Sequence, residues 1–389
     1  MNRSESRKED RPAHDAVVVG AGVIGLACAW ELHSRGLSVV VVDRAQPGGA
    51  TTAVAAGMLA PVGELDFGES DLLDMNLISA GQYPEFIASI ERSCGGAIGY
   101  RRCGGIHAAL DRDEAGELRR RHELQLRTGQ DSQWHGPAAA REIEPGLAPA
   151  LTGAVEVPGD GVVDPRLLTS ALVSSLESEG VPVRTAAVDT LKRSGGRFEA
   201  VGLEDGAQIR ADVAVVATGA ECGTADWLPE EIRPPVRPVK GQVAELRGDP
   251  ERPVCTRILG SERVYLVPRP DGRLIVGATS EELGFDRTVT AGGVYELLRE
   301  AGRLLPDVVE LEFLGARAGL RPGTPDNLPV IGPTAIPGVY LATGHYRNGI
   351  LLAPFTARAI AAMVTGESPE GPVTAADPGR FNRSAAGAR

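Results

Sequence analysis

The arrangement of hydrophobic and polar residues is clearest near the start of the chain. Residues 16–20 form an apolar run, residues 22–35 have the pattern of a helix that ends at Gly36, and residues 38–43 form a second apolar run. Continuous apolar runs are typical of strands buried on both faces, and a helix between two of them connects parallel strands. The pattern therefore predicts a β-α-β unit.

The rest of the chain mixes helical and extended patterns. Helices are predicted at residues 71–92, 112–128, 165–179 and 293–305. Extended segments or strands are predicted at residues 151–163, 181–212, 211–220, 239–246, 263–268, 273–278 and 308–316. We expect a loop rich in glycine and proline at residues 319–333. A final strand, loop and helix are expected at residues 339–364, with the helix starting at Ile350.

A nucleotide-binding motif lies inside the β-α-β unit. Gly20, Gly22 and Gly25 form a G-x-G-x-x-G sequence between the first strand and the helix, and Asp43 ends the second strand. The first glycine permits a tight turn, the second lets backbone amides approach a pyrophosphate, and the third lets helix and strand pack closely. The helix N-terminus attracts phosphate, and the acid can accept hydrogen bonds from ribose hydroxyls. The motif predicts a bound dinucleotide.

The dinucleotide could be NAD(P) or FAD. A nicotinamide domain usually continues with further β-α units, whereas here the parallel-sheet pattern resumes only at residues 211–219 and 339–344. A domain assembled from distant segments favours FAD, with Thr218 and Gly219 as contacts at one strand end. The alternative for residues 217–219 is an ordinary strand followed by a turn.

Composition and charge exclude several classes of protein. The chain has 389 residues, 42% hydrophobic and 24% charged, as expected for a folded protein of two to three domains. Its formal charge of −12 disfavours a nucleic-acid partner, and its three lysines leave no polybasic membrane patch. The five dispersed cysteines fit reduced thiols and lack the spacing of a metal site. The N-terminal segment carries no net charge, which argues against a signal peptide, so we expect a cytoplasmic protein.

Four segments carry a family resemblance. They are TTAVAAGMLAP at 51–61, YLVPR to VGAT at 265–279, AGLRPGT at 318–324 and ATGHYRNGILLAP at 342–354. Together they resemble the D-amino-acid-oxidase-like FAD-dependent oxidoreductases, and among these the glycine oxidases of thiamine biosynthesis. The matching segments occur in the same order as in that family, and the resemblance extends from about residue 15 to about residue 366.

The resemblance implies an α/β, two-domain fold. A Rossmann-like FAD-binding domain would comprise residues 14–85, 155–226 and 318–366, and a substrate domain with an antiparallel sheet would comprise residues 86–154 and 227–317. Residues 1–13 would be disordered and residues 367–389 a loose tail. The implied reaction is oxidative deamination of glycine or a similar small amino acid. A hydride passes from the substrate Cα to flavin N5, the imine is hydrolysed or used in thiazole synthesis, and dioxygen becomes hydrogen peroxide.

The resemblance also implies roles for single residues. Arg321 would bind the substrate carboxylate, for which its planar fork of donors is well matched. Tyr265 would add its hydroxyl, and Arg347 and Met58 would lie near substrate and flavin. The expected FAD contacts are Gly20, Gly22, Val23, Ile24, Gly25, Asp43, Arg44, Thr51, Thr52, Ala56, Gly57, Met58, Val188, Thr218, Gly219, Gly344, His345, Arg347, Asn348, Gly349, Ile350 and Leu351.

The loop at residues 344–349 has an independent argument. A glycine-bounded turn that leads into a helix directs free amides and the helix dipole at one point, where they would stabilise the negative charge of a reduced flavin. The alternative is a strand that simply enters its helix. We do not count His345 as a base, because hydride transfer from a neutral amine needs none.

Two residues depart from the glycine oxidase pattern. Ser280 stands where a methionine lines the pocket, and Arg317 stands where a tryptophan is familiar. Residues 315–333 contain no cysteine that could tether the flavin, so we expect noncovalent FAD. The alternatives are a sarcosine or D-amino-acid oxidase, a carrier-linked D-amino-acid dehydrogenase, and a flavin-binding scaffold without activity. The expected partners are a small amino acid, dioxygen and further copies of the chain, a tetramer by resemblance.

Overall fold

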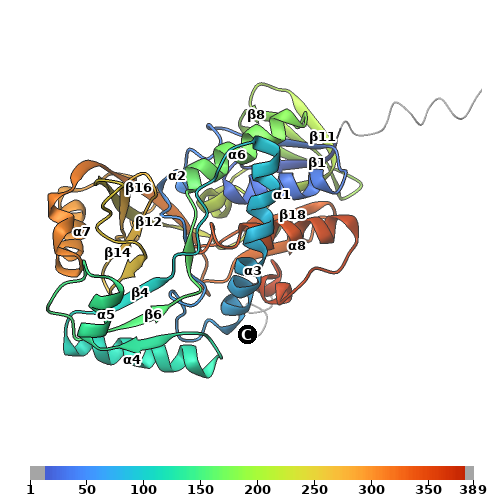
Figure 1. Cartoon of the computed structure of the whole chain (residues 1–389). Coiled ribbons are helices and arrows are strands. Elements are labelled where there is room, and N and C mark those ends of the chain that lie inside the picture. Colours follow the sequence, from blue (N-terminus) through green and yellow to red (C-terminus); the bar gives the residue numbers. More distant parts are fainter. Residues whose placement is uncertain (1–13, 382–389) are drawn as a thin grey trace, which may run out of the picture.

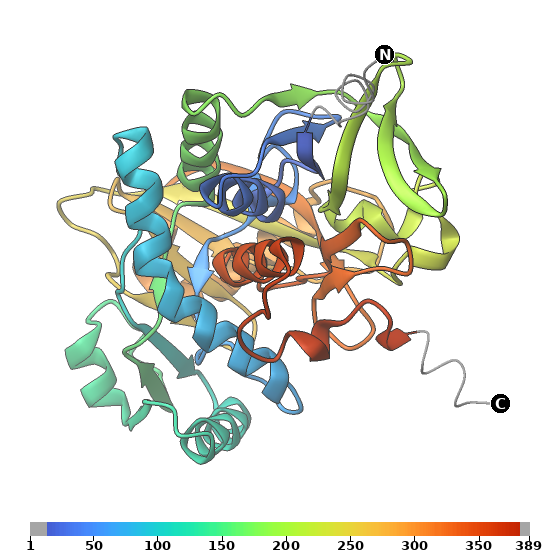
Figure 2. The same ribbon diagram turned by 90° about the vertical axis from the view of Figure 1, so that its right-hand side faces the viewer.

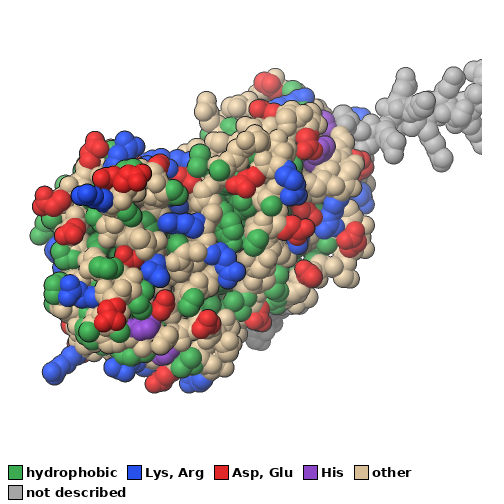
Figure 3. Space-filling model, viewed as in Figure 1, with side chains coloured by type: hydrophobic (Ala, Val, Ile, Leu, Met, Phe, Trp, Pro, Cys, Tyr) green, Lys and Arg blue, Asp and Glu red, His purple; other side chains and the backbone are tan. Residues whose placement is uncertain are grey.

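The computed structural model describes residues 14–381 and has a mixed α/β fold built on two large sheets (Figure 1). The predicted disordered segment 1–13 and residues 382–389 of the predicted tail lie outside the described residues. One sheet lies with α1, α6 and α8 on the right of Figure 1, and the other lies with α4, α5 and α7 on the left. On the face drawn in Figure 3, acidic and basic side chains are interspersed over both parts.

The first sheet contains the predicted β-α-β unit. Its strand order is β17-β18-β11-β1-β2-β8, and β10 and β9 extend from β11. The neighbours β18, β11, β1, β2 and β8 are all parallel. The bounds are β1 (His14–Val19), β2 (Val39–Asp43), β8 (Val183–Thr185), β9 (Val188–Ser194), β10 (Arg197–Leu203), β11 (Gln208–Val216), β17 (Val330–Pro333) and β18 (Val339–Thr343).

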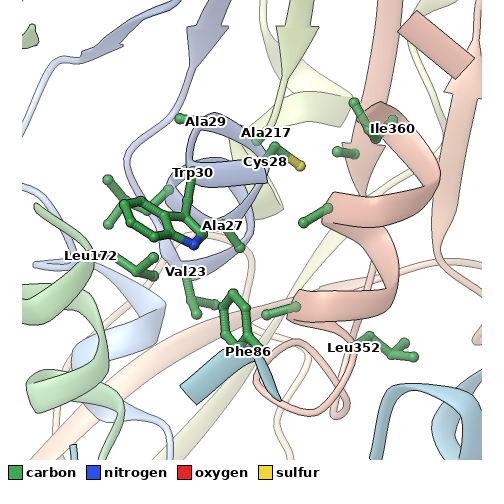
Figure 4. Packing of buried hydrophobic residues seen from close by; sticks show 14 of the residues in the cluster. Val23, Ala27, Cys28, Ala29, Trp30, Phe86, Leu172, Ala217, Leu352 and Ile360 are labelled. Atoms are coloured by element: carbon green, nitrogen blue, oxygen red, sulfur yellow. The ribbon is translucent and has the colours of Figure 1, made fainter. Parts of the chain in front are cut away.

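The alternation of side chains in β1 supplies two cores. Ala16 and Val18 pack with helices on one face of the sheet, whereas Val17 and Val19 pack with β9, β10 and their neighbours on the other. This explains why β1 has a continuous apolar run, since both of its faces are buried. The first core is shown in Figure 4, where Val23 and Trp30 of α1 lie near side chains of three other helices.

Four helices cover the first face of this sheet. They are α1 (Val23–Ser34), α3 (Ser70–Cys94), α6 (Pro165–Ser178) and α8 (Ala353–Thr365). Helix α1 packs against both α8 and α6, and the long helix α3 runs diagonally alongside them in Figure 2. The helices predicted at residues 71–92 and 165–179 are confirmed as α3 and α6.

The second sheet is mostly antiparallel. Its order is β16-β12-β15-β14-β13-β4-β6-β5, and only β13 and β4 are parallel neighbours. The bounds are β4 (Gly105–Ala109), β5 (Gln133–His135), β6 (Gly153–Val157), β12 (Arg237–Arg247), β13 (Ile258–Gly260), β14 (Tyr265–Pro268), β15 (Arg273–Gly277) and β16 (Glu312–Gly323). Its helices are α4 (Arg112–Arg127), α5 (Pro137–Ile143) and α7 (Ala291–Leu304). The short helix α2 (Thr51–Val54) and the pair β3 (Met58–Leu59) and β7 (Gly161–Val162) lie outside both sheets.

Several sequence expectations are wrong in detail. The expected loop at residues 319–333 is largely strand, because β16 pairs with β12 as far as Gly323 and β17 follows at Val330. The start of the expected strand at 308–316 is a 3₁₀ turn, Pro306–Glu310. The last helix begins at Ala353, three residues after Ile350. The expected tail is folded up to Phe381 and buries Val373 and Ala376.

The predicted domain boundaries fall inside continuous elements. Helix α3 runs through the boundary after residue 85, and β16 remains in the second sheet beyond the boundary after residue 317. The chain passes between the two sheets several times, since strands of the first sheet occur before, between and after those of the second. No helix in residues 14–381 is long and apolar enough to cross a membrane.

Candidate active site

A cavity of about 1140 Å³ lies between the two sheets. Its wall runs from the glycine loop after β1 to Tyr265 and Arg321 in the second sheet. The volume exceeds the roughly 300–1,000 Å³ usual for small-molecule sites. The cavity can therefore take an elongated cofactor together with a small substrate.

The glycine loop adopts a backbone that depends on its glycines. Gly20 has φ of 110°, and a Cβ there would lie 2.4 Å from the carbonyl oxygen of Ala217. A Cβ on Gly25 would lie 1.9 Å from the carbonyl oxygen of Gly20. Gly20 thus forms the tight turn, and Gly25 permits close packing of α1 on this loop, as the motif predicts.

Side chains hold the loop in position at the cavity wall. Asp43 Oδ2 accepts a hydrogen bond from the Ala21 amide at 2.6 Å, and Asp43 Oδ1 accepts one from Ala45 at 2.8 Å. Thr52 Oγ1 accepts a hydrogen bond from the Val23 amide, at the start of α1. Gly22, the N-cap of α1, contributes no capping side chain, so this helix end remains accessible to a phosphate.

Arg321 lies on β16, where the second sheet closes the cavity. Its Nη1 donates a hydrogen bond to the Thr279 carbonyl at 3.0 Å. A Cβ on Gly241, in the neighbouring strand β12, would lie only 2.4 Å from the same Nη1. The guanidinium therefore lies directly over a glycine, and the sheet can bring it to the cavity because no side chain stands there.

Tyr265 has the same relation to a second glycine. It pairs across strands β14 and β15 with Gly277, and a Cβ on Gly277 would lie 2.3 to 2.4 Å from atoms of the tyrosine ring. Burial raises the pKa of the Tyr265 hydroxyl, and the nearby charge of Arg321 acts in the opposite direction. The hydroxyl is thus kept protonated and can donate a hydrogen bond.

Arg347 and Met58 complete this end of the cavity. Arg347 Nη2 donates to Glu69 Oε2 at 2.9 Å, and Glu69 also accepts a hydrogen bond from Asn327. Met58 lies in the short strand β3 and lines the cavity. The four predicted catalytic side chains, from positions far apart in the sequence, are thus brought to one cavity.

Most of the predicted cofactor residues line this cavity. Those that do are Gly20, Gly22, Val23, Ile24, Asp43, Arg44, Thr51, Thr52, Ala56, Gly57, Met58, Val188, Thr218, Gly219, His345, Arg347, Gly349 and Ile350. Four do not: Gly25, Gly344, Asn348 and Leu351. Gly25 and Gly344 occupy packed positions, and Leu351 and Asn348 are buried behind the wall. Contact of these four residues with the cofactor stays a prediction.

His345 is buried and neutral. Its side chain shares a hydrogen bond of 2.9 Å with Thr356 Oγ1, and burial lowers its pKa to about 3. The histidine therefore anchors the turn before α8, which agrees with leaving it out of the catalytic set. Helix α8 begins only at Ala353, so its N-terminus does not lie at residue 350, where the sequence predicted it. The backbone amides of the turn at residues 344–349 remain the expected donors to the flavin.

The sequence reasoning missed Glu64. This carboxylate lines the substrate end of the cavity, and no hydrogen bond or ion pair of its side chain occurs among residues 14–381. Of the two departures noted in the sequence, Ser280 lines the cavity, whereas Arg317 lies outside the wall and forms an ion pair with Glu245. Only Ser280 therefore alters the pocket directly.

The wall fits a flavin dinucleotide. The open N-terminus of α1 and Asp43 suit the diphosphate and ribose, and Thr218 Oγ1 on the same wall is buried without a hydrogen-bond partner in the described chain. Such an unpaired hydroxyl is expected where a ligand supplies the partner. A dinucleotide cavity closed by an Arg–Tyr pair on a second sheet defines a flavin-dependent oxidoreductase.

The chain belongs to the family described as FAD dependent oxidoreductase (DAO), whose model matches residues 15–363. It is 35% identical to glycine oxidase of Geobacillus kaustophilus over 358 residues, which cover 90% of this chain and 93% of that protein. It is 37% identical to the bifunctional protein ThiO/ThiG of Trichormus variabilis over 90% of its own length. The chain covers 52% of that relative, so it spans about half the length of the bifunctional proteins it matches.

The fold agrees with a solved structure. The crystal structure of glycine oxidase from Geobacillus kaustophilus superimposes with a TM-score of 0.87 at 32% identity, covering 94% of this chain and 98% of that one. The α/β fold with two domains and the use of FAD, both expected from the sequence, are confirmed by the family and this match.

Proposed function

We propose that the chain is an FAD-dependent oxidase of glycine or a similarly small amino acid. The products would be glyoxylate, ammonia and hydrogen peroxide, by way of an imine. The observation that carries the proposal is the placement of Arg321 and Tyr265 at the end of the cavity away from the glycine loop. A cation with free donors next to a protonated hydroxyl is a site for a carboxylate.

Each residue has a definite task in this reaction. Arg321 keeps one bond to the Thr279 carbonyl, which orients the guanidinium, and its remaining donors bind the substrate carboxylate. The Tyr265 hydroxyl donates a further hydrogen bond to that carboxylate. Bound FAD supplies the acceptor for the hydride that leaves the substrate Cα. Thr218 and the glycine loop hold the cofactor and do not contact the substrate.

Ser280 bears on the choice among small substrates. Ser280 replaces the methionine expected from the glycine oxidase pattern and leaves a smaller, polar side chain on the wall. This favours sarcosine or a small D-amino acid as the alternative substrate. Since the solved and curated relatives include proteins named glycine oxidase, glycine remains the first substrate to test.

The names of the bifunctional relatives suggest a place in metabolism. Because those proteins are called ThiO/ThiG, we propose that the imine, or its hydrolysis product, serves thiamine thiazole synthesis. We further propose a homo-oligomer. Exposed apolar side chains near the outer edge of the second sheet, among them Tyr295, Val309 and Phe313, support self-association. The cytoplasmic location stays a prediction.

The test is a screen of the purified chain with FAD. Absorbance of the bound flavin is recorded, and peroxide is measured with glycine, sarcosine and small D-amino acids in the same sample. We expect a yellow protein that forms peroxide with at least one of them. Activity with an artificial electron acceptor but not with oxygen would instead indicate the carrier-linked dehydrogenase, and bound flavin with no activity would indicate a scaffold.

A further inference from the structure

A second, smaller cavity adjoins the substrate end of the first. It has a volume of about 230 Å³ and shares Met58, Glu64, Tyr265 and Arg347 with the large cavity. We call it the side cavity. Its rim carries the exposed residues Glu262 and Arg263, so it leads from the substrate pocket to solvent.

The side cavity is lined by polar groups that lack protein partners. His107 Nε2 and Arg121 Nε are buried and have no hydrogen-bond partner among the described residues. A Cβ on Gly63 would lie 2.4 Å from His107 Nε2 and 2.3 Å from Asp160 Oδ2, so these two side chains meet beside Gly63. A polar cavity of this size with unpaired donors and acceptors holds several water molecules in solution. The side cavity therefore has the room and the polar groups needed to hold a chain of water molecules.

Two carboxylates, Glu64 and Glu262, line both cavities; Glu262 is exposed at the rim, whereas Glu64 lies further in, among the groups of the substrate pocket. It lies between charged groups from several elements: Arg321 of β16, Arg347 of the loop before α8, Arg121 of α4 and Glu69 beside α3. Tyr265 and Asp160 also face it. Arg347 is already paired with Glu69, and Arg321 is bonded to a backbone carbonyl, which leaves Glu64 free to meet a cation from the substrate.

The proposed reaction creates a need for such a group. An amino acid in neutral water carries an ammonium group, and a hydride can leave Cα only after the nitrogen lone pair is free. We propose, building on the function above, that Glu64 is a catalytic base that takes one proton from the substrate ammonium. The N–H bond breaks, an O–H bond forms on the carboxylate, and the proton then passes to water in the side cavity and out to solvent.

The local electrostatics suit this task. Burial raises the pKa of Glu64, and the charges of Arg347 and Arg321 act in the opposite direction, so the carboxylate is a stronger base than an exposed one. His107 has its pKa lowered to about 4 by burial and is neutral above that pH, so it can accept or donate a hydrogen bond in the side cavity.

The experiment compares wild type with Glu64→Gln over a range of pH. Glutamine keeps the shape of the side chain but cannot take the proton. We expect kcat/KM for glycine to fall by roughly 10²-fold at neutral pH. The deficit should shrink as pH approaches the pKa of the free substrate ammonium, because solution then supplies the amine already deprotonated. Glu64→Asp should recover part of the loss. Glu123→Gln, an exposed carboxylate on α4 outside both cavity walls, is the matched control.

A second measurement separates catalysis from structure. Binding of glycolate, which has a carboxylate but no amine, is followed by the change in flavin absorbance. We expect Glu64→Gln to bind glycolate and FAD as wild type does. A deficit that is equal at every pH, or a parallel loss of glycolate binding, would overturn the role of Glu64. A wild-type protein that binds FAD but oxidises no amino acid would instead overturn the proposed function itself.

Discussion

The first prediction concerns the anchor for the substrate carboxylate. Arg321→Met removes the charge and all guanidinium donors but keeps much of the length and apolar stem. One Nη1 donor is used on the Thr279 carbonyl, so the side chain retains an edge with two further donors for a carboxylate. The substitution should therefore weaken binding of glycine in both its ground state and its transition state.

The size of the effect follows from those two donors. A hydrogen bond to a charged group contributes roughly 1.5–3 kcal/mol, so two contribute roughly 3–6 kcal/mol. Since about 1.4 kcal/mol corresponds to tenfold, kcat/KM for glycine should fall by roughly 10²–10⁴, mainly through KM. The assay is initial peroxide formation over a range of glycine concentrations, with FAD content measured in each sample.

Two controls isolate the carboxylate contact. Glycinamide has no carboxylate, so its kcat/KM, low in wild type, should change little in Arg321→Met. Arg317→Met removes another arginine of β16, one that pairs with Glu245 outside the cavity wall, and should leave kcat/KM for glycine near the wild-type value. A fall of less than about tenfold with glycine, or an equal fall with glycinamide, would refute the carboxylate role.

Three further predictions rest on packing and pH. Gly241→Ala places a Cβ 2.4 Å from Arg321 Nη1 and should raise KM without loss of FAD. The control is Gly292→Ala, whose Cβ would have no atom within 4 Å and should leave the kinetics unchanged. Equal KM values for the two variants would contradict the packing argument. The hydrogen bond from Lys240, the buried lysine of β12, lowers the pKa of Asp286 to about 2. The stability that this ionised carboxylate gives the folded state is therefore fully present above the unfolded pKa near 3.8 and is lost as pH falls through about 2. The difference in Tm between wild type and Asp286→Asn should accordingly shrink on acidification below pH 3.8, and a constant difference would speak against it. The pKa of His345 is lowered from 6.5 to about 3, so between these two pH values wild type should lose about 1.4 kcal/mol of stability per pH unit relative to His345→Gln. Urea unfolding at several pH values measures this difference, and parallel stability curves for the two proteins would contradict it.

The nucleotide half of the site was predictable because its signals are local. Gly20, Gly22 and Gly25 lie within six residues, and the neighbouring apolar runs identify the strands and the helix. A tight turn and a helix end depend on adjacent residues, so a short window of sequence contains the needed information. The structure places Gly25 behind the wall, in the packing role that the motif assigns to its third glycine.

The substrate half depends on contacts between distant strands. The strand that carries Arg321 was partly expected to be a loop, because its glycines and prolines are common in turns; pairing with β12 overrides that local preference. Gly241 and Gly277 show no local motif, and their importance follows only from the side chains that lie over them. Family resemblance identified Arg321 and Tyr265, but Glu64 has no local pattern and emerges only from the two cavities it lines.

The way the chain threads both sheets has a consequence for folding in the cell. Residues from 19 to 350 line one cavity, so a bound dinucleotide contacts segments that join the fold at very different points in the sequence. FAD at a hundred times its Kd would add about 2.7 kcal/mol to the stability of the native state. Because those contacts bridge the sheets, removal of FAD should make the whole molecule more sensitive to proteases, and flavin supply would then set how much of this protein survives.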